Sequence, residues 1–283
     1  MIIRCYFILS CVFVLGKLTV SQEYFDSLYN ECVLFYNNEE PEISCDCFGE
    51  LLKSDSLVSE LEEKVFLAHA YLLMETGNTG KSQRILKKML RKGYSNSTIY
   101  LYLARISESK SQPERNERIL KEALNLFPDN LALLEELINY YIENQEYELV
   151  LKYSYKALYL DSTNHELYFA HAYALQYAGK RMDAIDSYKT AIELNPEYFS
   201  ALYNLAVIYF NDAVEFMRKA NNSIDDFDKY SRFMNNAEKN LKLALPWFEK
   251  AYKIMRVPEI KNSLQIIYRH FEMEEKLNEL NEY

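Results

Sequence analysis

The sequence predicts an all-α fold, an α-solenoid of stacked helical hairpins, and two observations support this prediction. The 283 residues include only 6 Gly and 6 Pro, whereas an all-β sandwich or barrel needs turn residues at about every 8 to 12 positions. A pattern of apolar residues also recurs at a fixed interval of 34 from five starting points, namely 63, 97, 131, 165 and 199. Such a period is typical of folds in which each repeat is one helical hairpin and neighbouring repeats bury each other's apolar faces.

Each repeat contains two predicted helices. In the first helix, large apolar residues at the fourth position and small or branched residues at the eighth position share one helix face. A short break follows, which contains Gly77, Ser111, Gln145 or Gly179, and the second helix begins after it. Position four is held by Phe66, Tyr100, Leu134, Tyr168 and Leu202, and position eight by Ala70, Ala104, Ile138, Ala172 and Ala206.

The repeat that starts at 165 shows the whole pattern in phase, with Tyr168, Ala172, Leu175, Gly179, Ala184, Tyr188, Ala191 and Pro196. These residues at this period resemble the tetratricopeptide repeat. The resemblance implies a right-handed α-solenoid of about five helix pairs. We expect these pairs at residues 63–96, 97–130, 131–164, 165–198 and 199–256.

The fifth repeat departs from this length. In an ordinary repeat the small residues at positions eight and twenty, one on each helix, are 12 residues apart. In the fifth repeat the corresponding residues are Ala206 and Ala244, which are 38 residues apart. This repeat therefore contains 26 extra residues. Apolar residues keep helical spacing throughout the insertion, which predicts two lengthened helices with a turn at Asn221–Asp226. A short array that ends in such a hairpin resembles exported bacterial tetratricopeptide-repeat proteins.

Weaker helical hairpins are predicted on both sides of the repeats. Residues 22–62 form a degenerate N-terminal hairpin, with one helix at Tyr24–Tyr36, a second that includes Cys47–Leu52, and a polar connection at Asn37–Ser44. Residues 257–283 form C-terminal helices that cap the stack. Terminal repeats are expected to be atypical, because one of their faces has no neighbouring repeat to cover it.

Residues 1–21 have the pattern of a signal peptide. Arg4 precedes an apolar run from Cys5 to Gly16, whose 12 residues are too few for a membrane-spanning helix of about 20. We expect cleavage after Ser21 and export to a periplasmic or secreted location, where the protein could associate with the envelope. An uncleaved N-terminal anchor and lipidation at Cys11 are the alternatives. After cleavage, no direct membrane insertion is expected.

Charge and motif content disfavour several functional classes. Lys and Arg number 32 against 42 Asp and Glu, a net charge of −10 without a long basic run, which disfavours a nucleic-acid partner. The sequence contains no Gly-rich phosphate loop, nucleophile elbow or His-Glu-x-x-His motif. We therefore predict no enzymatic activity, catalytic residue, metal site or cofactor. His69 and His171 occupy the same repeat position and are expected to pack between helices.

Three cysteines lie in the N-terminal hairpin. In an oxidising compartment, Cys32 on the first helix could form a disulfide with Cys45 or Cys47 on the second. Buried free thiols are an alternative. A metal or redox site is another, although a fourth ligand for tetrahedral zinc is missing.

The resemblance also implies a binding surface. In tetratricopeptide arrays the first helices line a concave groove, and in this chain the aromatic residues at groove positions are concentrated between 169 and 210. Such side chains are enriched at interaction hot spots. The alternative is that they pack on the neighbouring helix. The groove residues are Leu67, Tyr71, Met74, Leu101, Arg105, Asn139, Phe169, Tyr173, Tyr177, Tyr203 and Phe210.

We therefore expect a non-enzymatic scaffold that binds a partner protein or peptide through its concave groove in an exported compartment. The first alternative is a structural homo-oligomer, assembled by self-association of the extended hairpin at Phe210–Leu241. Exposed apolar side chains at Phe216, Met217, Phe233 and Met234 would favour it, because an antiparallel helix pair needs only one apolar seam. The second alternative is a metal or redox role for the cysteine hairpin.

Overall fold

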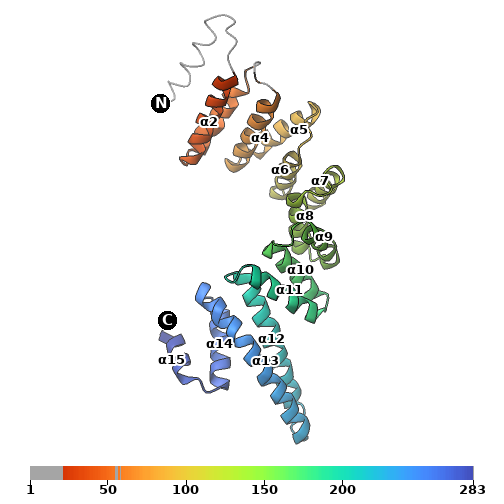
Figure 1. Cartoon of the computed structure of the whole chain (residues 1–283), viewed down its shortest axis with the longest axis vertical. Coiled ribbons are helices and arrows are strands. Elements are labelled where there is room, and N and C mark those ends of the chain that lie inside the picture. The colour runs from red at the N-terminus through yellow and green to blue at the C-terminus, as the bar shows by residue number, and fades with distance from the viewer. Residues whose placement is uncertain (1–21, 55–56, 58, 283) are drawn as a thin grey trace, which may run out of the picture. The chain divides into compact units, whose positions relative to one another are not determined.

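The computed structural model describes residues 22–54, 57 and 59–282, and the regular structure of these residues is entirely helical (Figure 1). This confirms the predicted all-α fold of paired helices. The expected signal peptide at residues 1–21 lies outside the described residues. The described helices are α2 (Gln22–Asn37), α3 (Pro41–Leu51), α4 (Ser59–Glu75), α5 (Thr79–Arg91), α6 (Ser97–Ser109), α7 (Pro113–Leu126), α8 (Leu131–Glu143), α9 (Tyr147–Leu160), α10 (His165–Tyr177), α11 (Arg181–Leu194), α12 (Phe199–Asn221), α13 (Phe227–Ile254), α14 (Pro258–His270) and α15 (Glu274–Glu282).

The chain forms two compact units, which divide between Leu133 and Leu134 within α8. In the N-terminal unit, a core cluster of α2, α3 and α4 contains buried side chains such as Phe48. In the C-terminal unit, a larger core runs from Ala172 on α10 to Leu280 on α15. Both cores follow from the sequence pattern, because each helix pair covers the apolar face that the preceding pair leaves open.

A left-handed residue ends the first helix of four successive repeats. Gly77, Ser111, Gln145 and Gly179 have φ values of 76°, 54°, 59° and 74°. After Ser111, Gln145 and Gly179, the next backbone N–H donates to the carbonyl five residues earlier, and at the third of these turns the bond measures 2.9 Å. This hydrogen bond is that of a Schellman motif. The break expected from the sequence is therefore a helix C-cap with a defined geometry.

The first hairpin closes in the same way, and its second helix begins earlier than expected. Glu39 has a φ of 61°, and the N–H of Glu40 donates to the Phe35 carbonyl at 3.0 Å. α3 then starts at Pro41, inside the segment that the sequence assigned to the connection. Proline suits the first turn of a helix, because the N–H that it lacks would have no partner there.

The hairpin of α12 and α13 is the longest in the described part of the chain. α12 has 23 residues and α13 has 28, compared with 13 and 14 in α10 and α11. Small buried residues occur on both helices, among them Ala213 and Ala237, and short side chains let helix backbones approach closely. The carboxylate of Asp226 caps α13 by accepting the N–H of Lys229 at 3.1 Å, as N-cap residues do.

Helices α14 and α15 close the C-terminal unit. Ile260, Leu264 and Ile267 on α14, together with Leu280 on α15, are buried in the core of that unit. Their burial removes apolar surface of the last repeat from water, as expected of capping helices. None of the helices that the structure describes combines the length and the apolarity needed to span a membrane.

Candidate functional site

Phe169, Tyr173 and Tyr177 form a row of aromatic rings on α10. The ring centroids of Phe169 and Tyr173 are 6.0 Å apart, and those of Tyr173 and Tyr177 are 4.8 Å apart. Tyr147, the first residue of α9, stacks on Tyr177 with centroids 4.5 Å apart and ring planes 8° apart. We call these four residues the α10 ladder. Its three members on α10 are spaced by four residues and so share one face of the helix.

The α10 ladder is anchored in the core at one end and reaches solvent at the other. The ring of Phe169 contacts Tyr188 on α11 and Tyr198, which precedes α12, with centroids 5.8 and 5.5 Å away. Tyr188 is fully buried, whereas 54% of Tyr177 is exposed. Phe169 therefore packs on a neighbouring helix, which is the alternative that the sequence left open. The ring of Tyr177, in contrast, is accessible to solvent.

The hydroxyls around the ladder are neutral hydrogen-bonding groups. The hydroxyls of Tyr173 and Tyr177 are 3.4 Å apart. This hydrogen bond is the main cause that raises the pKa of Tyr173, and burial is the second. Tyr188 donates to Oε1 of Gln176 at 2.9 Å, and burial raises the pKa of Tyr188 above its ordinary value. The ladder therefore presents uncharged rings and hydroxyls, which can stack against apolar groups and hydrogen-bond to amides.

A comparison with protein families matches a stretch that contains Tyr173 and Tyr177 of the ladder. A family model described as TPR repeat matches residues 173–212. This stretch begins at Tyr173 of the ladder and ends within α12. A tetratricopeptide repeat therefore lies within residues 173–212 of the chain.

Solved tetratricopeptide-repeat proteins have a similar fold. The structure of YrrB, described as a TPR protein with an unusual peptide-binding site, matches with a TM-score of 0.52 and 19% identity over 69% of this chain and 88% of YrrB. MamA (41-end) from Desulfovibrio magneticus RS-1 matches with a TM-score of 0.52 and 14% identity over 68% of this chain and 94% of MamA. Curated protein sequences gave no match. At these identities, the similarity establishes the fold.

On α12, the predicted groove residues Tyr203 and Phe210 lie at the edge of the core. Both rings contact the buried Phe248 of α13, with centroids 6.4 and 5.8 Å away. Tyr203 also stacks on Phe199 at 6.0 Å. These contacts bring Tyr203 and Phe210 together around one core residue, so both serve packing in the described structure.

In the N-terminal unit, Tyr71 of α4 belongs to a second aromatic cluster. Its hydroxyl lies 3.3 Å from that of Tyr36 on α2, and its ring centroid lies 5.9 Å from that of Tyr102 on α6. The hydrogen bond with Tyr36 and, to a smaller extent, burial raise the pKa of Tyr71 to about 12. Because Tyr36 is 40% exposed, this cluster also reaches solvent.

The other predicted groove residues lie outside these two clusters. Leu67, Met74 and Leu101 are half-buried on α4 and α6. Arg105 and Asn139 are exposed on α6 and α8. Their side chains are polar or only partly accessible, so they offer less apolar contact area than the α10 ladder.

Three members of the two clusters were not predicted as groove residues from the sequence, nor was the buried Tyr188 that contacts Phe169. The three members are Tyr36, Tyr102 and Tyr147. Tyr147 and Tyr188 belong to second helices, whereas the resemblance to tetratricopeptide repeats implies a groove lined by first helices. Tyr36 lies in the N-terminal hairpin, which precedes the five repeats at the 34-residue interval. The chain contains 25 Tyr, so tyrosine content alone does not select these four.

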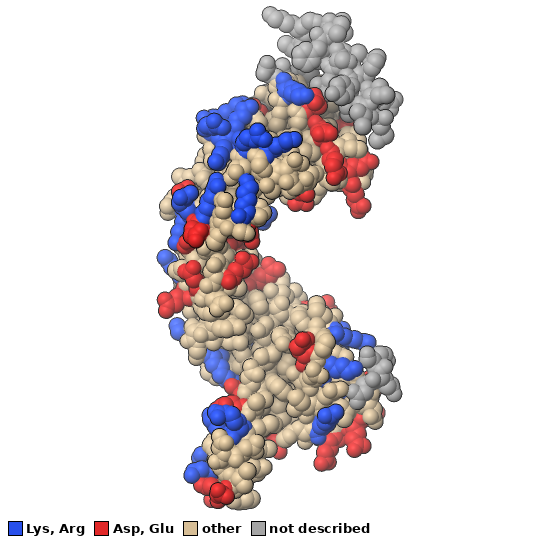
Figure 2. All heavy atoms as spheres, turned by 180° about the vertical axis from the view of Figure 1, so that it is seen from behind, with Lys and Arg blue, Asp and Glu red and all other residues tan. Residues whose placement is uncertain are grey.

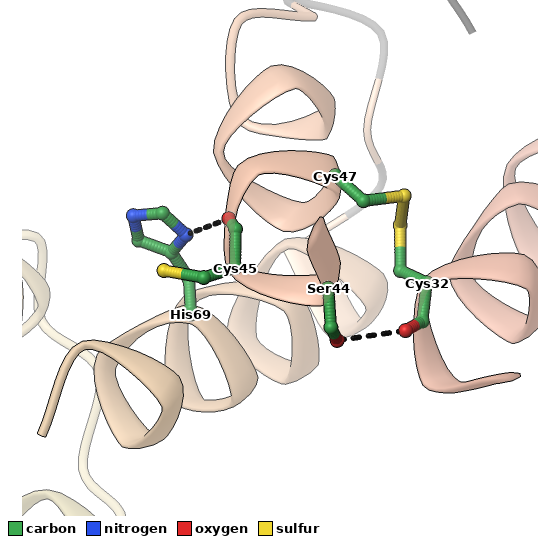
Figure 3. The surroundings of a disulfide bond; sticks show 5 residues. All are labelled: Cys32, Ser44, Cys45, Cys47 and His69. Carbon is green, nitrogen blue, oxygen red and sulfur yellow. Dashed lines mark hydrogen bonds between the residues drawn. A yellow bond between two sulfur atoms is a disulfide. The ribbon is translucent and has the colours of Figure 1, made fainter. Parts of the chain in front are cut away.

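In the cysteine hairpin, the structure pairs Cys32 with Cys47, whose Cα atoms are 5.5 Å apart (Figure 3). Ser44 adds a second link between α2 and α3, because its hydroxyl donates to the Cys32 carbonyl at 2.7 Å. Cys45 is a buried free thiol whose side chain points toward His69 and away from the disulfide (Figure 3). Burial raises the pKa of the Cys45 thiol, which opposes thiolate chemistry at this residue.

His69 and His171 occupy equivalent contacts between helices. Nδ1 of His69 lies 3.0 Å from the Cys45 carbonyl oxygen, and Nδ1 of His171 lies 2.9 Å from the Ser154 hydroxyl. Burial lowers the pKa of both imidazoles, which keeps them neutral near pH 7. Within the described ranges, no three His, Cys, Asp or Glu side chains gather as metal ligands.

Proposed function

We propose that the protein is a non-enzymatic scaffold that binds a peptide or an extended protein segment on the α10 ladder. The main support for this proposal is that the ring of Tyr177 is both exposed and held in place by a neighbouring ring. Its side chain is 54% exposed, yet it is held face to face with Tyr147 at 4.5 Å. An exposed ring that neighbouring rings already hold in place loses little conformational entropy when a partner binds.

The chemistry of the ladder suits a peptide. Tyrosine combines a large apolar ring with a hydroxyl and has few rotatable bonds, which is why it is enriched at interaction hot spots. The ladder offers such rings from Tyr147, Tyr173 and Tyr177 along one face. YrrB, which has a similar fold, is described as having a peptide-binding site, and this description supports a ligand of the same class here.

Selection of peptides on the purified protein tests this proposal. A random library of peptides of about 12 residues would be panned against the protein, and the affinities of selected peptides measured by calorimetry. A Tyr147→Ala/Tyr177→Ala variant removes the outer pair of the ladder. A Tyr155→Ala/Tyr159→Ala variant is the matched control, because these two tyrosines are 73% and 87% exposed on α9.

We expect the ladder variant to bind the selected peptides at least about tenfold more weakly, as truncation of an aromatic hot spot does. The control variant should keep the affinity of the parent protein. Circular dichroism checks that both variants keep the helical content. Equal affinities of the parent and the ladder variant, or a library that yields no binder, would reject the proposal.

We also propose that the mature protein starts at Gln22 and lies in an oxidising, exported compartment. The apolar run from Cys5 to Gly16 supports export, and the Cys32–Cys47 disulfide is of a kind that persists outside reducing compartments. Mass spectrometry of the native protein is the test. A chain that retains Met1 and carries both cysteines as thiols would overturn this assignment.

A second candidate function is self-assembly through the α12–α13 hairpin. Ile224 and Phe227 at the hairpin turn are 69% and 78% exposed, and neighbouring exposed apolar side chains can mark a protein–protein contact. Phe216, Met217, Phe233 and Met234 are half-buried, so the exposed apolar surface lies at the turn instead of along the helices. Light scattering compares the mass of the parent with that of Phe227→Asp, and a monomeric parent rejects this function.

A further inference from the structure

Helix α5 carries a concentration of positive charge that contrasts with the net charge of −10 of the whole chain. Its sequence from Thr79 to Arg91 contains no Asp or Glu. We call its cations, with the residue that follows the helix, the basic stripe: Lys81, Arg84, Lys87, Lys88, Arg91 and Lys92, all of them exposed.

The basic stripe covers one side of the helix. Ser82, Leu86 and Met89 are buried on the opposite side, where they pack into the N-terminal unit. Residues spaced by three, four and seven positions share a helix face, and Lys81, Arg84, Lys88 and Lys92 follow this spacing. Figure 2 shows blue side chains gathered over this part of the N-terminal unit, in the upper part of the view.

The stripe has little neutralising charge of its own. Glu62 of α4 is the carboxylate within ion-pair distance of it in the described part of the chain, with Oε1 2.5 Å from Nζ of Lys92. The second oxygen of Glu62 accepts from the Tyr94 hydroxyl at 2.6 Å. The charge of Lys88 also acts on Glu62. Burial raises the pKa of this carboxyl, but its hydrogen bonds and the charges of Lys92 and Lys88 lower it below its ordinary value. Like charges on one helix face repel, so the other cations of the stripe favour the approach of a negatively charged group.

The Phe66 side chain positions two of the cations. Nζ of Lys88 and Nζ of Lys92 each lie 5.3 Å from the centroid of the Phe66 ring, a distance at which the ring attracts a cation. Phe66 itself is buried, with 3% of its surface exposed. A buried ring therefore holds these two ammonium groups near each other at the surface, in spite of their like charge.

An open pocket lies at the N-terminal end of the stripe. It has a volume of ≈ 370 Å³ and is lined by His69, Leu73, Lys81, Arg84 and Ile85. Leu73 and Ile85 provide apolar surface, and the two cations stand at its edge. Such a pocket can hold an apolar side chain whose neighbours are carboxylates.

We propose that the basic stripe and its pocket bind an acidic segment of a partner protein, in which several Asp or Glu flank one apolar residue. From Lys81 to Lys92 the helix rises by about 16 Å, which an extended peptide of about five residues spans. The carboxylates would pair with the stripe, and the apolar side chain would enter the pocket. This surface lies on α5 and shares no residue with the α10 ladder. The two proposals are therefore tested by different variants, and the failure of one does not affect the other.

The surroundings of the stripe favour a peptide over a lipid surface or a nucleic acid. Helices that bind anionic membranes insert large apolar side chains beside their cations, but no large hydrophobic side chain is exposed between residues 59 and 125 of the described chain. Tight nucleic-acid binding needs many phosphate contacts along an extended surface, whereas this stripe occupies a single helix. The negative charge of the rest of the chain would also repel a long polyanion.

Fluorescence anisotropy with a labelled probe tests the proposal. The probe is a peptide of about ten residues made of Glu and Asp with one central Leu, and a second probe has Gly in place of Leu. The test variant is Arg84→Glu/Lys88→Glu. The matched control is Lys239→Glu/Lys253→Glu, which makes the same change in net charge at two exposed lysines of α13.

We expect the Leu probe to bind the parent protein, with an affinity that falls between about 50 and 200 mM salt. The test variant should bind it at least about tenfold more weakly, because each reversal replaces attraction by repulsion, and the control variant should bind as the parent does. A Lys88→Arg variant, which keeps the charge, should also retain binding. The Gly probe should bind severalfold more weakly than the Leu probe.

Three results would overturn the proposal. The first is equal affinity of the parent and the Arg84→Glu/Lys88→Glu variant for the Leu probe, and the second is an equal loss in the control variant. The third is absence of binding of the Leu probe to the parent protein. Binding to phosphatidylserine vesicles or to a single-stranded oligonucleotide would then assign the stripe to a lipid surface or to a nucleic acid instead.

Discussion

The hydroxyl of Ser82 donates to the backbone carbonyl of Ala70 across 2.7 Å, which joins the second helix of a hairpin to the first. Ser44 makes the same bond to the Cys32 carbonyl, also at 2.7 Å and also over 12 residues of sequence. Positions 44 and 82 are 38 apart, as are positions 32 and 70. The N-terminal hairpin therefore follows the pattern of the repeats, with four residues added to the 34-residue period.

Replacing Ser82 by Ala should lower the free energy of unfolding by about 1 kcal/mol, because a buried hydrogen bond between two helices is lost. Urea unfolding followed by circular dichroism measures this change. Ser263→Ala is the control, since the Ser263 hydroxyl bonds the Glu259 carbonyl within a single helix at an exposed site. An unfolding midpoint of Ser82→Ala equal to that of the parent would contradict the structural role of this bond.

Removal of the disulfide should destabilise the N-terminal hairpin. Cys32 and Cys47 enclose a loop with a sequence separation of 15, and closing such a loop stabilises the folded state by about 3 kcal/mol. We expect Cys32→Ala/Cys47→Ala to lose a stability of this order in urea unfolding, and a reductant to have no further effect on it. Cys45→Ala, which keeps the disulfide, should still respond to the reductant. A parent protein whose unfolding ignores the reductant would refute the pairing.

Two glycines should respond in opposite directions to substitution by Ala. A Cβ atom on Gly49 would lie 2.9 Å from Cε1 of His69, whereas one on Gly80 would meet nothing within 4 Å. Gly49→Ala should therefore cost about 1 to 3 kcal/mol, as overpacking does. Gly80→Ala should add about 0.5 to 1 kcal/mol, because Ala is the better helix former at this site in α5. Thermal unfolding of both variants measures the two signs, and a destabilised Gly80→Ala would contradict the open surroundings of that residue.

The buried histidines should make stability fall in mild acid. Burial lowers the folded-state pKa of His69 and His171 below the value of about 6.5 that an unfolded chain has. Between these two values the unfolded state binds more protons, so the contribution is fully present above about pH 6.5 and is lost as the pH falls below it. We expect the urea midpoint to drop between about pH 7.5 and pH 5, and to drop less in a His69→Asn/His171→Asn variant. Equal drops in both proteins would disprove this linkage.

The register of the repeats could be predicted from the sequence because close packing of helices requires a small residue at the same positions of each repeat. Ala172 and Ala191 are fully buried, and only small side chains fit where two helices approach closely, so the period is visible in the sequence. The N-terminal hairpin has the same internal spacing, but four residues added between Ser44 and Ala70 shift it out of the 34-residue register. The sequence predicts Pro41 in the connection, whereas in the structure Pro41 begins α3.

The candidate site could be predicted only in part, because sequence spacing shows which residues share a helix face but not how two helices cross. Phe169, Tyr173 and Tyr177 share one face of a single helix, which the spacing of their sequence positions reveals. The stacking of Tyr147 on Tyr177 depends on how α9 and α10 cross, and no periodicity encodes that crossing. The basic stripe lies within a chain of negative net charge, so whole-chain composition concealed it.

The placement of the three thiols on α2 and α3 sets an order for oxidative maturation. Cys45 and Cys47 are two residues apart, which turns them about 200° from each other around α3, with Cys47 bonded to Cys32 and Cys45 directed at His69. Before α3 forms, an oxidant can join any two of the three, and a wrong pair is released only by thiol exchange. Once α3 has formed, Cys45 faces away from Cys32. If α3 forms before the thiols are oxidised, Cys47 is therefore the thiol of α3 that faces Cys32, and the helix itself favours the native pairing.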